Sequence, residues 1–307
     1  MRRTDAGIGG ADDVALPNQV TGSRAGVTPM TYPPWVVLHV PHDSTTVPAE
    51  VRSQFLLDDT ELGRELDRMT DHRTLAIFAD PSSDAAVVRS PVSRLVVDVE
   101  RFADDADEPM TARGMGAVYT ATSQLTPLRR RLSAGEREAL MQAYYRPHHA
   151  RLEAAVATAL ERHDRCLVID CHSFPSVALP YEMADPTNAR PDICIGTDDF
   201  HTSDELAGAF SAAFRRAGWR LSLNEPFAGA LVPGSRYRRD SRVGTVMVEV
   251  NRGLYLREVD ATPSADFEDV ALRIRESCVE AIASWSSWKE QDVGSDGLAR
   301  SRVCRLG

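Results

Sequence analysis

The sequence predicts an α/β fold, namely a three-layer α/β/α sandwich around a mostly parallel or mixed sheet. Short apolar runs rich in β-branched residues alternate with segments of helical periodicity, which is the pattern of strands and helices that follow one another along a chain. Several runs are apolar at nearly every position, which is typical of strands covered on both faces. A chain of 307 residues is long enough to bury a large core in this way.

Six apolar runs are expected to form the strands of the sheet. They lie at residues 35–40, 85–88, 94–98, 165–174, 192–196 and 245–252. The run at 165–174 is the most informative, because its apolar part stops where Asp170, His172 and Ser173 arrive together. In open α/β sheets, ligands bind beyond the carboxyl ends of such strands. The cluster therefore predicts either a functional site or a capped turn, since Asp also favours turns.

Four segments with helical periodicity are expected to cover the sheet. They lie at residues 60–72, 133–162, 204–217 and 264–284. In the second segment, Ser133 and Glu136 have the spacing of a capping box, and Pro147 predicts a kink or a break. The first segment carries Asp67 and Asp71 one helical turn apart, shortly after the strand at 35–40.

The composition is that of an ordinary soluble globular protein, with 43% hydrophobic and 26% charged residues. A formal net charge of -10 disfavours binding to nucleic acids and to anionic membrane surfaces, and no apolar stretch is long enough to span a bilayer. The 5 cysteines lack zinc-finger spacing, and their odd number indicates reduced thiols. Residues 4–30 contain no apolar signal-peptide core, so we expect a cytoplasmic protein.

The predicted elements also divide the chain. Residues 1–30 are rich in Gly, Ala, Asp and Thr, and we expect them to form a disordered extension. Residues 31–288 hold all the predicted strands and helices and are expected to form a single α/β/α domain. Residues 289–307 are expected to form a flexible tail. The sequence leaves the oligomeric state open, a homo-oligomer included.

Polar residues lie at or just after the carboxyl ends of four predicted strands, and strand ends meet in space at the edge of a sheet. They are His42; Asp98 with Arg101; Asp170 with His172; and Glu249 with Asn251 and Arg252. Two histidines and one carboxylate leave the fourth position of a tetrahedral zinc ion open for water, as in catalytic zinc sites. Such an ion lowers the pKa of its water and polarises a carbonyl oxygen. His42 and His172 are the candidate ligands, and Asp67 and Asp71 both remain candidates for the carboxylate.

Each of these residues also has a simpler explanation. A single histidine after a strand is more often a turn or core residue, and Asp67 and Asp71 are as well explained by a solvated helix face. Two histidines that are each closely followed by a serine and that each come after a hydrophobic strand favour the metal site. Glu249 lies between two valines, and a carboxylate within an apolar strand is costly to bury unless it is paired or functional. Such a group can move a proton from water to a leaving amine.

Three arginines lie close to these acids in the sequence. Arg94, Arg101 and Arg252 could merely neutralise local carboxylates, but arginine is also the natural bidentate clamp for the carboxylate of a substrate. Cys171 lies between Asp170 and His172, yet its side chain should point to the opposite face of the strand, so we assign it no nucleophilic role.

Taken together, these motifs resemble those of the N-formylglutamate amidohydrolases. The resemblance runs from about residue 36 to residue 252 and depends on the order of short motifs. The motifs are Pro41-His42-Asp43-Ser44, Thr70-Asp71, Ser93-Arg94-Leu95-Val96-Val97-Asp98 with Arg101, Asp170-Cys171-His172-Ser173 and Glu249-Val250-Asn251-Arg252.

The resemblance implies a phosphorylase/hydrolase-like fold similar to that of zinc carboxypeptidases. It implies hydrolysis of N-formyl-L-glutamate to formate and glutamate, late in one route of histidine degradation, with one zinc ion per chain. The implied metal ligands are His42, Asp71 and His172, so the resemblance selects Asp71 over Asp67, and the implied base is Glu249. The residues implied to bind the small anionic substrate are Arg94, Arg101, Asn251 and Arg252. Asp170, Ser44 and Ser173 are expected to support the ligands from behind, Asp170 by orienting an imidazole.

The chain departs from the family pattern at two places. The family usually has His-Ser-Gly in the first loop, where this chain has His42-Asp43-Ser44, and it commonly has Asn where this chain has Glu100. An additional acid beside the expected clamp would repel a dianionic substrate, so related N-acyl amino acids are substrates to consider. Two alternatives use the same residues: a peptidoglycan-type amidase or carboxypeptidase, and a non-catalytic protein that binds a metal or a carboxylate.

Overall fold

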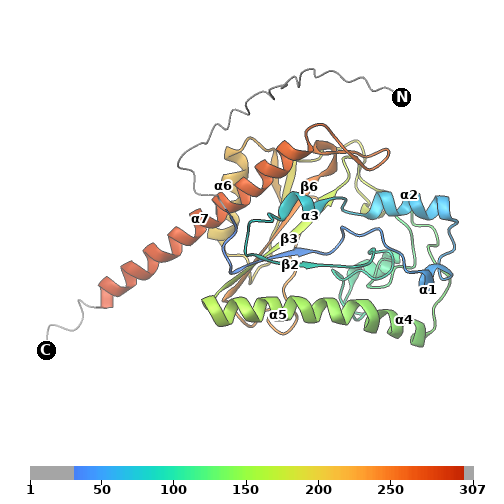
Figure 1. Ribbon diagram of the computed structural model, residues 1–307, viewed down its shortest axis with the longest axis horizontal. Helices are drawn as coiled ribbons and strands as arrows, with labels where there is room; N and C mark the ends of the chain where they lie inside the picture. Colours follow the sequence, from blue (N-terminus) through green and yellow to red (C-terminus); the bar gives the residue numbers. More distant parts are fainter. Residues whose placement is uncertain (1–30, 301–307) are drawn as a thin grey trace, which may run out of the picture. The chain divides into compact units, whose positions relative to one another are not determined.

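The computed structural model describes the backbone of residues 31–300 and the side chains as far as residue 286. The expected extension at 1–30 and residues 301–307 lie outside this range. A six-stranded sheet has the order β2-β1-β3-β6-β4-β5 (Figure 1). The strands are β1 (Val36–Val40), β2 (Ala86–Arg89), β3 (Cys166–Phe174), β4 (Ile193–Gly196), β5 (Leu221–Leu223) and β6 (Val243–Asn251). Neighbours are parallel except β4 and β6, so the sheet is mixed and mostly parallel, as predicted.

Helices cover both faces of this sheet. Figure 1 shows α5 on one side and α3 and α7 on the other, with α6 packed beside α7. The α-helices are α1 (Ala49–Arg52), α2 (Asp59–Met69), α3 (Thr74–Phe78), α4 (Ala134–Leu140), α5 (Arg146–His163), α6 (Asp204–Arg216) and α7 (Phe267–Arg300). Short 3₁₀ segments (Pro109–Arg113, Pro180–Glu182, Arg252–Leu254) and a small hairpin of β7 (Leu256–Arg257) and β8 (Thr262–Pro263) complete the fold. Within residues 31–300, none of the helices combines the length and apolar character that crossing a bilayer demands.

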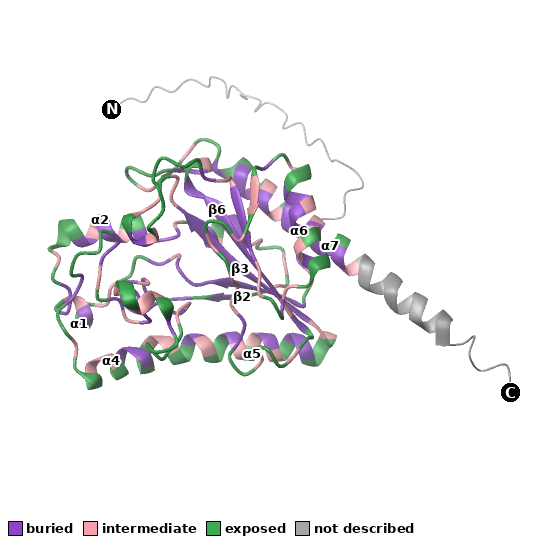
Figure 2. Cartoon of the chain, turned by 180° about the vertical axis from the view of Figure 1, so that it is seen from behind, coloured by how far each residue is buried: buried purple, intermediate pink, exposed green. Residues whose placement is uncertain are grey.

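The alternation of side chains along β3 separates the two layers of the core. Ile169 and Cys171 are fully buried in the cluster formed with α3, α6 and α7, whereas Val168 packs in the cluster formed with α5. Because successive side chains of a strand point to opposite faces, Asp170 and His172 lie on the α5 side. Figure 2 shows β3 buried along its length and β6 buried except at Gly244.

The interruption at Pro147 takes the form of a π-helical turn. Residues Met141–Tyr145 form this turn between α4 and α5, so the helical segment stays continuous although proline supplies no N–H to it. The predicted capping box is confirmed, since the Ser133 hydroxyl accepts from Glu136 N and the Glu136 carboxylate accepts from Ser133 N. At the other end of the chain, α7 continues to Arg300, beyond the end at residue 284 that the sequence predicts.

The prediction of a strand at residues 94–98 is wrong, because this segment forms turns. The Ser93 hydroxyl accepts a hydrogen bond from Leu95 N, and the Ser93 carbonyl accepts one from Val96 N, which bends the chain at the start of the segment. The buried Arg129 guanidinium then donates to the carbonyl oxygens of Leu95 and Val96. The apolar side chains of this segment are buried, as in a strand. Its carbonyl oxygens, however, bond the Arg129 side chain and not a neighbouring strand.

Candidate metal centre

Four polar side chains lie on one face of the sheet, within the strands themselves. In the parallel pair β3–β6, His172 lies opposite Glu249, and in the pair β1–β3, His39 lies opposite Asp170. The apolar part of the run at 165–174 stops before Asp170, as the sequence indicates, but the strand itself does not, since β3 continues through the polar residues to Phe174. Glu249 likewise lies inside β6, which ends at Asn251. Regular pairing therefore fixes the relative positions of these side chains.

Three potential metal ligands converge beside β3. Asp71 Oδ2 lies 3.1 Å from His172 Nδ1 and 3.6 Å from His42 Nδ1, and the three side chains are almost completely buried. The Asp71 carboxylate comes from the turn after α2, whereas Asp67 is exposed on that helix. Within the described part of the chain, His42 Nδ1 is buried and has no hydrogen-bond partner. Two imidazole nitrogens and one carboxylate oxygen in this arrangement fit a zinc ion.

Each histidine of this trio bonds a carboxylate through its second ring nitrogen. His42 Nε2 lies 2.8 Å from Asp98 Oδ1, and His172 Nε2 lies 3.0 Å from Asp170 Oδ1. An N–H donated from Nε2 leaves the lone pair of Nδ1 directed toward Asp71, which is the usual arrangement of histidines that bind a metal. The expected position of Asp170 behind an imidazole agrees with this geometry. Asp98 has the same relation to His42, which the sequence does not reveal.

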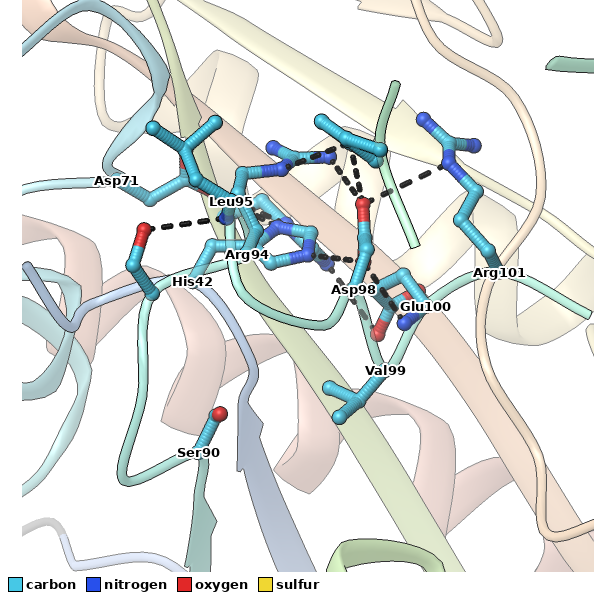
Figure 3. A network of polar contacts seen from close by, with 12 residues as sticks. His42, Asp71, Ser90, Arg94, Leu95, Asp98, Val99, Glu100 and Arg101 are labelled. Atoms are coloured by element: carbon cyan, nitrogen blue, oxygen red, sulfur yellow. Dashed lines mark hydrogen bonds and ion pairs between the residues drawn. The ribbon is translucent and has the colours of Figure 1, made fainter. Parts of the chain in front are cut away.

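Two arginines converge on the buried Asp98 (Figure 3). Arg94 donates to Asp98 Oδ2 at 3.0 Å, and Arg101 Nε lies 3.6 Å from the same oxygen. Burial alone would raise the pKa of Asp98, but Arg94 and His42 hold it well below its usual range. The Tyr119 hydroxyl donates to this carboxylate as well. Arg101 is the more accessible of the two guanidinium groups, since 22% of its side chain is exposed compared with 11% for Arg94.

Arg252 and Asn251 have structural partners in this conformation. Arg252 donates to Asp71 Oδ1 at 3.0 Å, to Ser173 Oγ and to the Arg68 carbonyl, so it orients the expected carboxylate ligand. Asn251 accepts from Gly253 N and donates to the Pro191 carbonyl.

The two serines expected behind the ligands differ from each other. Ser173 contributes its backbone N–H to Asp71 Oδ2 at 3.3 Å, next to the trio. The Ser44 hydroxyl instead donates to the Pro91 carbonyl and accepts from Thr46 N, so it joins its own loop to the turn after β2 and does not bond the trio.

Glu249 is a buried carboxylate beside the trio. Only 7% of it is exposed, and its Oε2 has no hydrogen-bond partner within the described residues. Burial raises the pKa of Glu249 to about 8; His172 opposes this shift and Asp71 adds to it. A carboxyl with its pKa near neutrality can take up a proton and release it again, which suits a general acid–base group.

These groups share one cavity of about 860 Å³. Its walls include the metal-ligand trio, Glu249, Arg94 and Arg101, so the residues expected to bind metal, move a proton and hold a carboxylate all reach one space. Much of the remaining wall is apolar, with Phe174 and the segment at residues 226–232. A cavity of this kind, with convergent polar groups on an apolar background, is the usual form of a small-molecule site.

Sequence reasoning missed a second group of polar residues beside the trio. His39 is completely buried within β1, and it contacts Asp170 and Glu100. The signal that could have revealed His39 is the same as for Glu249, namely one polar residue inside an apolar strand. Glu100 is noticeable only as a departure from the family pattern.

Comparisons with known proteins agree with this fold and identify the family. A family model described as N-formylglutamate amidohydrolase matches residues 35–256. A crystal structure of N-formylglutamate amidohydrolase from Ralstonia eutropha JMP134 is 21% identical with a TM-score of 0.70, covering 81% of this chain and 92% of that chain. The Agrobacterium tumefaciens gene product Atu2144 is 21% identical with a TM-score of 0.61, covering 83% of this chain and 92% of that chain. No curated protein matches the chain.

Proposed function

The chain belongs to the N-formylglutamate amidohydrolase family, and from this premise we propose that it is a zinc-dependent hydrolase of N-formyl-L-glutamate or a related N-acyl amino acid. The observation that carries the proposal is the convergence of His42, Asp71 and His172 beside the buried Glu249 in one cavity. The products would be the free carboxylic acid and the free amino acid. The family match also favours this reaction over peptidoglycan hydrolysis.

The side chains that would bind the zinc ion are held in place by neighbouring residues. His42 and His172 would bind the ion through Nδ1 while Asp98 and Asp170 hold their Nε2–H groups, and Arg252 would keep Asp71 oriented. When bound, zinc supplies Lewis acidity that polarises the amide carbonyl and makes water more acidic.

Glu249 is the proposed acid–base group. Its carboxylate accepts a proton from the water that attacks the amide carbon, and it then delivers that proton to the amine nitrogen as the C–N bond breaks. Burial favours this role, because it keeps the pKa of Glu249 near the pH at which both transfers must occur.

Arg94 and Arg101 are the proposed contacts for a substrate carboxylate. Both guanidinium groups line the cavity, and Asp98 holds them side by side. Asp98 neutralises part of their charge, and Glu108 lies 4.0 Å from Arg101. A substrate carboxylate would therefore accept hydrogen bonds from both guanidinium groups, in surroundings whose net positive charge is modest.

The cellular setting is part of the same proposal. We propose the cytoplasm as the location and histidine degradation as the pathway, because the family resemblance implies that route. The described cysteines support a reducing compartment, since Cys166, Cys171, Cys194 and Cys278 are buried free thiols.

The experiment that tests this function is an amine-release assay with the zinc-loaded protein. N-formyl-L-glutamate and a panel of N-formyl and N-acetyl amino acids serve as substrates. We expect turnover by the unaltered protein and a loss of about 10²- to 10⁴-fold in kcat for Glu249→Gln, with the zinc content unchanged.

The matched control is Glu258→Gln, because Glu258 is an exposed glutamate that lines a neighbouring cavity and bonds Ser176. This variant should keep full activity. Turnover retained by Glu249→Gln would refute the role of Glu249, and binding without turnover across the whole panel would indicate a non-catalytic protein.

A further inference from the structure

A second group of potential metal ligands lies directly behind the first. His39 Nδ1 is 2.8 Å from Asp170 Oδ1 and 3.0 Å from Glu100 Oε1. The His39 and Asp170 side chains are completely buried, and 14% of the Glu100 side chain is exposed, where it lines the cavity. One imidazole nitrogen and two carboxylate oxygens thus converge on one point.

The charges of this second group are unbalanced. Asp71 is paired with Arg252 and Asp98 with Arg94, but in residues 31–286 the ion-pair partners of Asp170 and Glu100 are imidazoles alone. Two carboxylates at such depth require a compensating positive charge. The cluster therefore needs either a protonated imidazole or a bound cation.

Glu100 has an acceptor atom that no described hydrogen bond satisfies. Its Oε1 is buried and lies close to His39 Nδ1, yet that nitrogen carries at most one hydrogen, which Asp170 can accept. An unpaired carboxylate oxygen in a buried position is costly. An ion between the three side chains would satisfy this oxygen directly.

The other ring nitrogen of His39 has its own partner. His39 Nε2 lies 2.7 Å from Nε2 of the buried His148, so one of the two nitrogens must donate. His148 can be the acceptor of this pair, because a neutral imidazole has one ring nitrogen that carries no hydrogen. If His39 donates from Nε2, the lone pair of Nδ1 is free to face Asp170 and Glu100, as in histidines that bind metals.

We propose that His39, Glu100 and Asp170 hold a second divalent cation beside the first. Nitrogen and carboxylate donors suit zinc and similar transition-metal ions. Ligand atoms around a tetrahedral zinc ion lie about 3.3–3.6 Å apart, as follows from bonds of about 2.0–2.2 Å, so the two oxygens need to move away from His39 Nδ1 by only about 0.5 Å.

The second ion would be connected to the first metal site. Asp170 Oδ1 lies 3.0 Å from His172 Nε2, and His172 Nδ1 faces the first site. Because Glu100 lines the cavity, the second ion would also border the substrate. Its occupancy does not depend on the proposed hydrolysis, so the two proposals fail separately.

The test is a count of bound metal. Protein freed of metal with a chelator is equilibrated against zinc, and bound zinc per chain is measured by mass spectrometry and by calorimetric titration. We expect two ions in the unaltered chain and one in Glu100→Asn, which introduces the residue common in the family. Retention of one ion by this variant would also show that it has folded.

The matched control is Asp67→Asn, which removes an exposed acid of α2 that lines the neighbouring cavity and should retain two ions. His39→Asn should bind one ion, like Glu100→Asn. A single ion in the unaltered chain would overturn the proposal and leave a protonated His39 as the compensating charge. Two ions in Glu100→Asn would also overturn it, because the second ion would then bind elsewhere.

Discussion

The two faces of β3 differ in what they contribute to the protein. Ile169 and Cys171 face α3, α6 and α7 in an apolar cluster, whereas Asp170 and His172 face the cavity from the same stretch of backbone. All four side chains are buried. Burial therefore does not distinguish them, but the partners do: apolar atoms on one face, and imidazoles and carboxylates on the other.

This difference shows how a single strand serves both stability and chemistry. The alternation of side chains keeps polar groups out of the apolar layer, and parallel pairing with β6 brings Glu249 opposite His172. The apolar face anchors the strand, and the polar face borders unsatisfied atoms of neighbouring elements, namely His42 Nδ1 after β1 and Glu249 Oε2 of β6, neither of which has a hydrogen-bond partner within the described residues. Such unsatisfied atoms cost stability and are expected at functional sites.

The largest effect that separates the two faces is expected for neighbours on β3. His172→Ala removes a proposed ligand and should lower zinc affinity at the first site by more than about 100-fold, since even residues behind a ligand contribute 10- to 100-fold. Cys171→Ala changes the adjacent residue on the apolar face and should retain zinc. Calorimetric titration with zinc measures both variants. Equal affinities would remove the distinction between the faces.

The second expected effect concerns the apolar face. Ile169→Ala leaves a cavity in the layer beneath α7 and should lower the free energy of unfolding by about 2–5 kcal/mol. Zinc stoichiometry and the kcat of the folded protein should not change, because Ile169 points away from the cavity. Denaturant titration with the metal removed gives the stability, and a stability loss below 1 kcal/mol would contradict the assignment of Ile169 to the core.

The sequence was sufficient to predict most elements of the fold. Apolar runs and helical periodicity located β1, β3, β6 and α6 closely, because the packing of the sheet reinforces the local pattern. The exception at residues 94–98 shows the limit of that reasoning. Its apolar side chains are buried as expected, but Arg129, which is distant in sequence, binds the carbonyl oxygens of a turn.

The site was predictable where the chemistry is local. Two His–Ser strand ends and a glutamate between valines indicated His42, His172 and Glu249, which the structure brings to one cavity. The partners of these residues were not predictable, because they depend on three-dimensional contacts. No spacing in the sequence reveals that Asp98 bonds His42 or that Arg252 bonds Asp71.

A smaller effect is expected for Arg101, which lies in a loop and not in the sheet. Its guanidinium lines the cavity from a loop, and its Nε is buried without a hydrogen-bond partner in the described part of the chain. Arg101→Ala should raise KM by about 10- to 100-fold, since a hydrogen bond to a charged group contributes about 1.5–3 kcal/mol.

The same substitution should leave zinc binding unchanged, because Arg101 contacts Asp98 at 3.6 Å and none of the proposed ligands. Arg64→Ala is the matched control, since Arg64 is exposed and lines the neighbouring cavity. Steady-state kinetics with an N-acyl amino acid and with its amide, which lacks the free carboxylate, identifies the contact. If Arg101 binds that carboxylate, the unaltered protein should have a higher KM for the amide than for the free acid. Arg101→Ala should have similar KM values for both. An equal rise in KM for the amide in both proteins would assign the carboxylate to Arg94 instead, the other guanidinium that Asp98 holds at the cavity wall.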